Sequence, residues 1–463
     1  MKRRIPILVF SIILIAFVIG IINLKSILAL LSLDSPDNHF VTRSGSTLIL
    51  QGKPFRFAGA NIYWLGLQDL DDTVSYPTPF SVDDVLATAS FMGETVVRSH
   101  TLGISVGCDL CVEPSRGVFN QTALQQIDYA LQSAKKHHLR LIIPLVDNWH
   151  YYHGGKHTFT DWHGLSNEED FYTHPSVIND FKQYISTILN HVNSYTKVAY
   201  KDDPTILSWE TGNELSAPRQ WVEMISAYIK EIAPRHLVMD GNYEQANELT
   251  NFSSNLSIPT VDIYTGHYYP PTISALRSAL KQANDANKVF IVGEYDWNTT
   301  EGDELKEFLA TIEQSNVAGD LYWSLFAHGD SHGLLSNKEH FVLHYPGDTP
   351  AMRNRVTMLH AHANQMHGMT KPSERQPGIP AITAIDGSNI LWRGAYGADT
   401  YTIERSTQGI TGPWEVICDR CVTDLSIPWV DTKRPSGTVA YRIRAHTSSG
   451  VPGPYSAIYW FKG

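Results

Sequence analysis

Short apolar runs alternate with amphipathic helical patterns through most of this 463-residue chain. One run, Leu139–Val146, is apolar throughout, as expected for a strand of a parallel sheet that is covered on both faces. Strands that alternate with helices form parallel β–α units, and eight such units close into a barrel. The sequence therefore predicts a (β/α)8 barrel. Its strands are expected at Phe57–Asn61, Thr95–Ser99, Leu139–Val146, Thr205–Leu207, His236–Asp240, Thr260–His267, Val289–Glu294 and Gly319–Trp323.

Two glutamates come at the ends of predicted strands. Glu214 follows the strand Thr205–Leu207 after a short loop, and Glu294 ends the strand Val289–Glu294. The carboxyl ends of the strands form the catalytic face of such a barrel, so both side chains are expected at one mouth. Hydrolysis of a glycosidic bond by the usual route needs two carboxyls. The pair therefore indicates a glycosidase, and Asn213 is placed to bind a sugar hydroxyl beside Glu214.

Other predicted strand ends also carry polar or aromatic side chains. A single polar strand end has an ordinary structural explanation, but several that converge on one mouth favour a functional site. Aromatic rings at such a mouth can pack in the core or stack on sugar faces. The residues expected at the site are Arg98 after the second strand, Trp149 and His150 after the third, His267 and Tyr269 after the sixth, and Trp323 at the end of the eighth.

These residues resemble the pattern of glycoside hydrolase family 5, and most closely its β-mannanase branch. The resemblance covers about residues 40–366. Two segments depart from the pattern: the third-strand loop, 147–173, is rich in His and Tyr, and Gly107–Cys111 has no counterpart in it. The motifs that carry the resemblance are Gly59–Trp64, Val97–Arg98, Leu145–Trp149, Asn213–Glu214, His267–Pro270, Glu294 and Trp323.

The resemblance implies a retaining double displacement without a metal or an organic cofactor. Glu294 would be the nucleophile, which Arg98 and Tyr269 keep ionised, and Glu214 would be the acid and then the base. The other implied roles are binding of the sugar 2-hydroxyl by Asn213, orientation of Glu214 or the sugar by His267, a sugar-binding floor at Trp323, and outer subsites at Trp64, Trp149, His150, Trp162 and Trp297.

The expected activity is endo-acting cleavage of β-1,4-mannan. Three activities of the same fold remain as alternatives: an exo-acting β-mannosidase, a β-glucanase and a transglycosylase. A non-catalytic glycan-binding surface protein is an alternative of another class, which the presence of both glutamates, Arg98 and Asn213 disfavours. The net charge of −11 argues against nucleic acid and against a polyanionic substrate. We expect a monomer whose partner is a polysaccharide or an oligosaccharide.

The N-terminus predicts export. Residues 1–30 combine a basic start with a long apolar run and fit either a cleaved signal peptide or a retained signal-anchor helix. Both interpretations place the body of the protein outside the cytoplasm, secreted or anchored to the outer face of the membrane. Residues 31–39 are a predicted linker, and 40–369 are the predicted catalytic domain.

The C-terminal part changes to short alternating strands punctuated by Gly and Pro. Residues 370–379 are a predicted linker, and 380–463 a small β-sandwich. This part resembles a fibronectin type III domain at Trp392, Tyr401–Arg405, Tyr441–Ala445 and Gly453–Ser456. We expect a spacer or packing module, with direct glycan binding as the alternative.

The four cysteines form two C-x-x-C pairs, Cys108 with Cys111 and Cys418 with Cys421. Outside the cytoplasm each pair is expected to form a local disulfide. A zinc site of four thiolates is the alternative, and it is disfavoured because the two pairs lie in different predicted domains.

Overall fold

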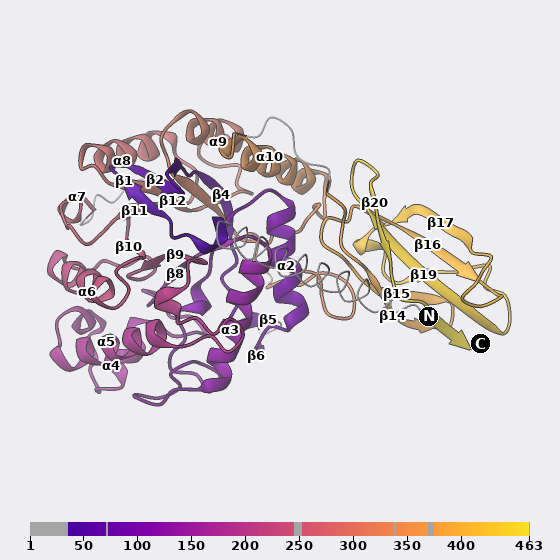
Figure 1. Cartoon of the computed structure of the whole chain (residues 1–463), viewed down its shortest axis with the longest axis horizontal. Coiled ribbons are helices and arrows are strands. Elements are labelled where there is room, and N and C mark those ends of the chain that lie inside the picture. The colour runs from indigo at the N-terminus through magenta and orange to yellow at the C-terminus, as the bar shows by residue number, and fades with distance from the viewer. Residues whose placement is uncertain (1–35, 71–72, 245–251, 338, 369–374, 463) are drawn as a thin grey trace, which may run out of the picture.

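The computed structural model describes residues 36–70, 73–244, 252–337, 339–368 and 375–462. A barrel and a smaller pair of sheets lie side by side (Figure 1). The predicted signal or anchor segment, residues 1–30, lies outside the described residues, as does most of the linker at 31–39. Within the described ranges no helix is both long enough and apolar enough to cross a membrane.

Eight parallel strands close into a barrel, which confirms the predicted (β/α)8 fold. Each strand pairs with the next one along the chain, and the last pairs with the first. The interval between β10 and β11, which has the weakest helical pattern, contains only the short helix α7 (Phe252–Asn255) in its described part. The strands are β4 (Phe57–Asn61), β7 (Val96–Arg98), β8 (Arg140–Pro144), β9 (Ile206–Glu210), β10 (Leu237–Glu244), β11 (Ile263–Tyr268), β12 (Val289–Tyr295) and β13 (Gly319–Trp323).

Helices surround the barrel and pack apolar faces against its strands (Figure 1). The helix α3 is typical: the Asn120 side chain accepts hydrogen bonds from its first backbone N–H groups, and Leu124, Ile127 and Leu131 are buried. The longer helices are α2 (Pro79–Phe91), α3 (Gln121–Lys136), α5 (Pro175–Asn190), α6 (Arg219–Ile232), α8 (Ile273–Asp285), α9 (Leu305–Gln314) and α10 (Pro350–Met366); α4 (Lys156–Asp161) is short.

A small three-stranded antiparallel sheet closes the end of the barrel where the strands begin. It comprises β1 (Thr42–Ser44), β2 (Thr47–Leu50) and β3 (Lys53–Pro54). Its Val41 and Leu48 side chains join a buried cluster with apolar residues from the barrel strands. The opposite end, where the strands finish, carries the polar side chains predicted from the sequence.

The C-terminal residues form two antiparallel sheets that share one apolar core, as expected for a β-sandwich. Trp392 from one sheet and Tyr401 from the other pack together in that core, with ring centroids 5.8 Å apart. The sheets are β14 (Ala381–Asp386), β15 (Asn389–Arg393) and β18 (Trp429–Val430), and β17 (Glu415–Val422), β16 (Thr400–Ser406), β19 (Thr438–His446), β20 (Pro452–Tyr455) and β21 (Tyr459–Lys462).

A buried carboxyl next to the barrel makes stability depend on pH. Glu94 is 4% exposed and accepts a hydrogen bond from the Tyr322 hydroxyl at 2.8 Å. Burial raises the pKa of Glu94 to about 8; the Tyr322 hydrogen bond opposes this rise, and the nearby Asp320 carboxylate adds to it. Because the folded pKa lies above the unfolded one, the folded state favours the protonated form. The contribution of Glu94 to the free energy of unfolding is therefore fully present below the unfolded pKa, and it is lost as the pH rises through about 8.

The replacement Glu94→Gln should remove this dependence, because an amide has the shape of the protonated acid and does not ionise. At pH 9 we expect it to raise the free energy of unfolding by on the order of 3 kcal/mol, with little change at pH 5. Denaturant unfolding at both pH values measures the effect. The same change at pH 5 and pH 9 would contradict a raised pKa at Glu94.

Candidate active site

The two glutamates predicted as the catalytic pair lie together at the mouth of the barrel. Glu294 is on β12, and Glu214 is in the loop after β9. A carboxylate oxygen of each lies within 4.8 Å of one from the other. Glu214 has a positive φ of 53°, a conformation that is uncommon outside glycine and that clusters at functional sites. Two carboxyls this close fit a retaining glycosidase rather than an inverting one.

Glu294 is buried among groups that favour its ionised form. Its carboxylate accepts hydrogen bonds from Arg98 Nη1 at 2.7 Å and from the Tyr269 hydroxyl at 2.8 Å, the two contacts expected from the sequence. Burial opposes ionisation, but His267, His100 and Arg98 outweigh it and lower the pKa of Glu294 below its usual range. These contacts favour the ionised carboxylate, the form that a nucleophile requires.

Arg98 is held by a second carboxylate that the sequence analysis did not single out. Glu210, at the end of β9, accepts hydrogen bonds from Arg98 Nε at 2.8 Å and from Arg98 Nη2 at 3.1 Å. Both side chains are fully buried. Arg98 Nη2 also donates to Asn213 Oδ1 at 2.8 Å. The guanidinium is therefore fixed in the plane that contacts Glu294 and Asn213. The sequence does indicate this residue, because Glu210 ends an apolar strand and lies four residues before Glu214.

Glu214 contacts two of the predicted site residues. Trp149 Nε1 donates to one of its oxygens at 2.5 Å, and His267 Nδ1 lies 2.8 Å from the other. His267 Nδ1 is also 3.6 Å from Glu294. Burial lowers the pKa of His267, but the Glu294 and Glu214 carboxylates raise it by more than burial lowers it, so the net shift of the pKa is upward. His267 therefore stands between the two carboxyls and can carry positive charge toward both.

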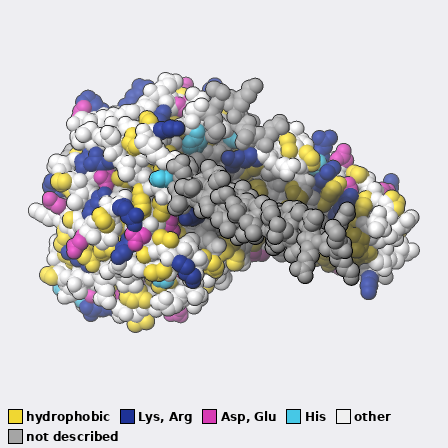
Figure 2. Space-filling model, viewed as in Figure 1, with side chains coloured by type: hydrophobic (Ala, Val, Ile, Leu, Met, Phe, Trp, Pro, Cys, Tyr) yellow, Lys and Arg dark blue, Asp and Glu magenta, His cyan; other side chains and the backbone are white. Residues whose placement is uncertain are grey.

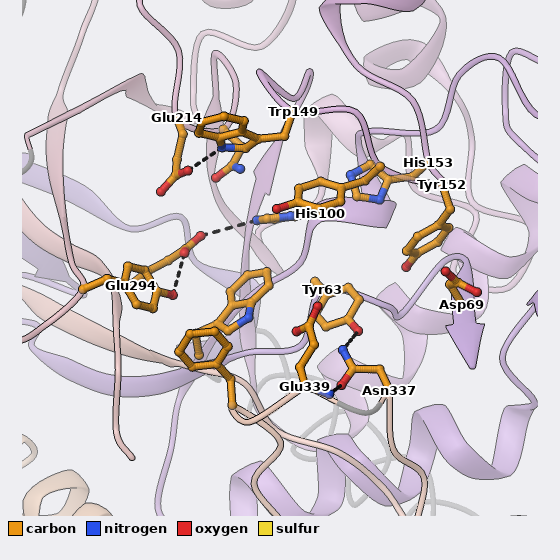
Figure 3. Close-up of a pocket in the computed structure, with 15 residues that line it drawn as sticks. Tyr63, Asp69, His100, Trp149, Tyr152, His153, Glu214, Glu294, Asn337 and Glu339 are labelled. Carbon is orange, nitrogen blue, oxygen red and sulfur yellow. Dashed lines mark hydrogen bonds and ion pairs between the residues drawn. The ribbon is translucent and has the colours of Figure 1, made fainter. Parts of the chain in front are cut away.

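Glu214 and Glu294 line a cavity of about 370 Å³. In Figure 3 Glu214, Trp149 and Glu294 lie at one end, and Asp69, Tyr152, Asn337 and Glu339 at the other. Trp323 lines the cavity, and its ring stacks on Tyr63 with centroids 5.2 Å apart and lies 5.1 Å from the His100 ring. Residues of the lining that the sequence analysis did not select are Tyr63, Asp69, His100, Tyr151, Tyr152, His153, Asn337, Glu339 and Phe341.

Trp64 and His150, which were expected at outer subsites, do not line the cavity. Trp64 is 1% exposed, donates to the Leu325 carbonyl at 3.2 Å and packs against Phe326, so it is a core residue beneath the mouth. His150 is exposed, but it hydrogen-bonds Glu168 at 2.7 Å and is not in the cavity lining. Of the further tryptophan candidates, Trp162 and Trp297 also lie outside the lining.

His100 and His153 could be found from the sequence pattern after the fact. His100 follows Arg98 by two residues, and its Nε2 lies 2.9 Å from Arg98 Nη1 and 3.6 Å from Glu294. His153 belongs to the aromatic third-strand loop and pairs with Asp147 at 3.0 Å. Asn337, Glu339 and Phe341, by contrast, lie in the long segment after β13, which has neither a helical nor a strand pattern in the sequence.

Two groups of side chains in the described residues have the composition of a metal site: His100 with Asp147 and His153, and Glu214 with His267 and Glu294. The Arg98 guanidinium contacts a member of each group. Its fixed positive charge disfavours a cation at either place.

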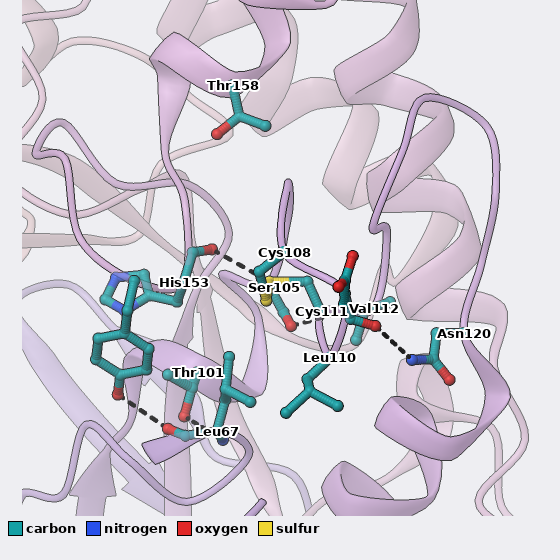
Figure 4. The surroundings of a disulfide bond; sticks show 12 residues. Leu67, Thr101, Ser105, Cys108, Leu110, Cys111, Val112, Asn120, His153 and Thr158 are labelled. Atoms are coloured by element: carbon teal, nitrogen blue, oxygen red, sulfur yellow. Dashed lines mark hydrogen bonds between the residues drawn. A yellow bond between two sulfur atoms is a disulfide. The ribbon is translucent and has the colours of Figure 1, made fainter. Parts of the chain in front are cut away.

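The cysteines are joined as two local disulfides, Cys108 to Cys111 and Cys418 to Cys421. The first lies close to His153, a residue that lines the cavity (Figure 4). In its loop the Val106 N–H donates to the His153 carbonyl at 3.0 Å. This loop, without a counterpart in the family pattern, therefore supports the backbone of a residue that lines the cavity.

Comparisons with known proteins agree with this geometry. Residues 38–300 match the family model described as GH family 5 beta-mannosidase-like. Mannan endo-1,4-beta-mannosidase 3 of Arabidopsis thaliana is 30% identical in an alignment that covers 65% of this chain and 84% of the relative. Mannan endo-1,4-beta-mannosidase 1 of Solanum lycopersicum is 29% identical, with coverage of 72% and 92%. Two other Arabidopsis relatives are 33% identical, and the chain spans 58% of their length.

Solved structures share the fold. The crystal structure of the endo-1,4-beta-mannanase from Rhizomucor miehei has a TM-score of 0.61 and 27% identity, and the alignment covers 71% of this chain and 99% of that one. The endo-beta-1,4-mannanase from Thermotoga petrophila has a TM-score of 0.59 at 21% identity, with coverage of 89% and 98%, and shows a common fold. The chain therefore belongs to the beta-mannosidase-like group of glycoside hydrolase family 5.

Proposed function

We propose that this protein is a retaining glycoside hydrolase that cleaves β-1,4-linked mannan-type polysaccharide from within the chain. The observation that carries the proposal is the close approach of the Glu214 and Glu294 carboxyls, of which Glu294 accepts a hydrogen bond from the Arg98 guanidinium. The relatives named as mannan endo-1,4-beta-mannosidases support the choice of substrate.

In the first step Glu294 attacks the anomeric carbon while Glu214 gives its proton to the leaving oxygen. In the second step Glu214 takes a proton from water, which attacks the glycosyl-enzyme and releases Glu294. Asn213, held by Arg98, is placed to bind the 2-hydroxyl of the sugar, a contact that strengthens in the transition state. Trp323 supports the cleaved sugar, and His267 keeps Glu214 in position.

Trp149 has a separable part in this scheme, because its indole N–H donates directly to Glu214. Trp149→Phe keeps an aromatic side chain, although a smaller one, and removes the indole N–H donor. We expect kcat/KM on mannan oligosaccharides to fall about 10-fold or more, the scale of one hydrogen bond to a charged group. An aryl mannoside with an acidic phenol, which leaves without a proton, should be affected less. Equal losses on both substrates would show that Trp149 only binds sugar.

A hydrolysis panel tests the proposed function. It contains mannan, glucomannan, cellulose and aryl β-glycosides, with products separated by size. Internal cleavage of mannan into a ladder of oligosaccharides is expected. Release of mannose alone would identify an exo-acting β-mannosidase, cleavage of cellulose a β-glucanase, and products longer than the substrate a transglycosylase. Binding without any hydrolysis would leave only the glycan-binding protein.

We also propose the domain organisation expected from the sequence, with a catalytic domain at 40–369 and a second domain at 380–463. The strand orders β14-β15-β18 and β17-β16-β19-β20 support a fibronectin type III-like sandwich. Two disulfides support a location outside the cytoplasm. On the face shown in Figure 2 basic and acidic side chains are interspersed, which suits an uncharged glycan and a monomer.

A further inference from the structure

The segment after β13 doubles back on itself and reaches both the cavity and the sandwich. Its outward limb, 324–328, pairs with its return limb, whose described residues are 334–337 and 339–343. Ser324 exchanges backbone hydrogen bonds with Phe341 and Leu343, and the Leu335 N–H donates to the Ala327 carbonyl. The two limbs therefore move as one unit, and a contact at the tip is transmitted to the residues of the return limb.

The return limb forms one side of the cavity. Asn337 and Phe341 line it, Asn337 Nδ2 donates to the Tyr63 hydroxyl at 2.6 Å, and the Phe341 ring lies 5.5 Å from the Tyr269 ring. Tyr63 stacks on Trp323 and Tyr269 contacts Glu294, so this limb is in contact with the sugar-binding floor and with the nucleophile's partner. Its position determines the width of the cavity.

His328, near the tip, joins the barrel to the sandwich. Its Nδ1 lies 2.8 Å from Asp84 on α2, and its Nε2 lies 3.3 Å from Asp424 in the sandwich. Asp424 also accepts a hydrogen bond from the Tyr401 hydroxyl at 2.8 Å. Burial lowers the pKa of His328, but the Asp84 and Asp424 carboxylates raise it well above its usual value. The imidazole is thus a buried cation between two carboxylates, a geometry that fixes the orientation of all three.

The sandwich also has a complementary shape at this place. Gly394 lies so close to His328 that a Cβ atom added to it would be 2.2 Å from the imidazole ring. Thr383 Oγ1 donates to the Ser331 carbonyl at the tip, at 2.6 Å. The sandwich therefore contacts this loop both through the close approach of Gly394 to His328 and through the Thr383 hydrogen bond. A domain that served only as a spacer would need neither contact.

We propose that the C-terminal sandwich positions the substrate-binding limb of the 324–343 loop, with His328 as the positioning residue. The sandwich thereby acts in substrate affinity at a distance, although none of its residues lines the cavity among the described parts of the chain. The proposal rests on the proposed hydrolase function for its kinetic consequence, but its structural consequence can be measured without any substrate.

The test compares Asp424→Asn with a matched control in the same sandwich. Asp431 is likewise buried, accepts a hydrogen bond from the Tyr441 hydroxyl at 2.9 Å and pairs with a cation, Arg405, at 2.9 Å. None of its hydrogen bonds or ion pairs reaches the described residues of the loop. Asp431→Asn should therefore cost similar stability and leave the loop in place. Gly394→Ala is a second variant, which displaces the His328 ring by volume instead of by charge.

Hydrogen–deuterium exchange of the full-length protein is the first measurement, over peptides within 324–337. We expect faster exchange in Asp424→Asn and Gly394→Ala, and wild-type exchange in Asp431→Asn. Unchanged exchange in both loop-facing variants overturns the proposal, whatever the substrate is.

Kinetics on mannohexaose are the second measurement. Both loop-facing variants should raise KM about 3- to 10-fold, the scale of one or two lost polar contacts, with kcat nearly retained and with wild-type constants in Asp431→Asn. Equal kinetic losses in all three variants would reduce the sandwich to a stabilising domain and overturn the proposal. If the three variants show the predicted exchange but the wild type does not hydrolyse mannan, the function is wrong and the positioning role stands.

Discussion

Replacement Glu294→Ala should reduce turnover of mannan by about 10⁵-fold or more, the scale expected when a covalent nucleophile is removed. The neighbouring Glu210 cannot substitute for it, because Glu210 is held by two hydrogen bonds to Arg98 on the far side of the guanidinium. Steady-state kinetics on mannohexaose measure the loss, and circular dichroism shows that the fold is kept.

Azide and an aryl mannoside with a good leaving group distinguish this variant from a merely damaged site. The small anion can occupy the space left by the Glu294 carboxylate and attack the anomeric carbon once. The product should be an α-mannosyl azide, of inverted configuration. Wild-type turnover in Glu294→Ala would place the catalytic centre elsewhere, and a β-mannosyl azide would show that the two glutamates have exchanged roles.

Replacement Glu214→Ala should have an effect that depends on the leaving group. Mannan needs a proton on its leaving oxygen, so its turnover should fall on the order of 10³-fold, within the usual contribution of acid–base catalysis. An acidic phenol leaves without protonation, so the first step on an aryl mannoside is largely spared. The second step lacks its base, and the glycosyl-enzyme should accumulate after a rapid burst of phenol.

Azide needs no base, and it should relieve the slow second step of Glu214→Ala. The product is then a β-mannosyl azide, because two inversions occur. Stopped-flow detection of the phenol and NMR of the azide measure both effects. Equal losses on mannan and on the aryl mannoside, without a burst, would contradict the role of Glu214 as acid and base.

The barrel and the catalytic pair could be predicted from the sequence because both follow from periodic patterns. Parallel strands covered on both faces must be apolar, and the first residues after them are free to be polar. Glu294, Arg98 and Tyr269 all lie at such ends, and the structure brings them into direct contact. Position along a strand thus determined which side chains reach the mouth.

Positions further from a strand end could not be predicted in this way. Trp64 and His150 lie next to residues that line the cavity, but their own side chains contact the Leu325 carbonyl and Glu168 instead, and the sequence does not encode that direction. Asn337 enters the cavity from a long return limb, and no local signal in the sequence encodes a contact to Tyr63 that spans more than 270 residues. The contact between His328 and Asp424 is likewise between two domains and depends on their packing.

Covalent trapping is the most direct test of the account. In a 2-deoxy-2-fluoro-β-mannosyl fluoride the C2 fluorine destabilises the oxocarbenium-like transition states of both steps. The fluoride leaving group compensates for this in the first step only, so a retaining enzyme stops as the glycosyl-enzyme. Mass spectrometry of the protease-digested protein then locates the sugar. The account predicts one labelled peptide with the sugar ester on Glu294. A label on Glu214, or hydrolysis of mannan with no label and with α-configured first products by NMR, would contradict it.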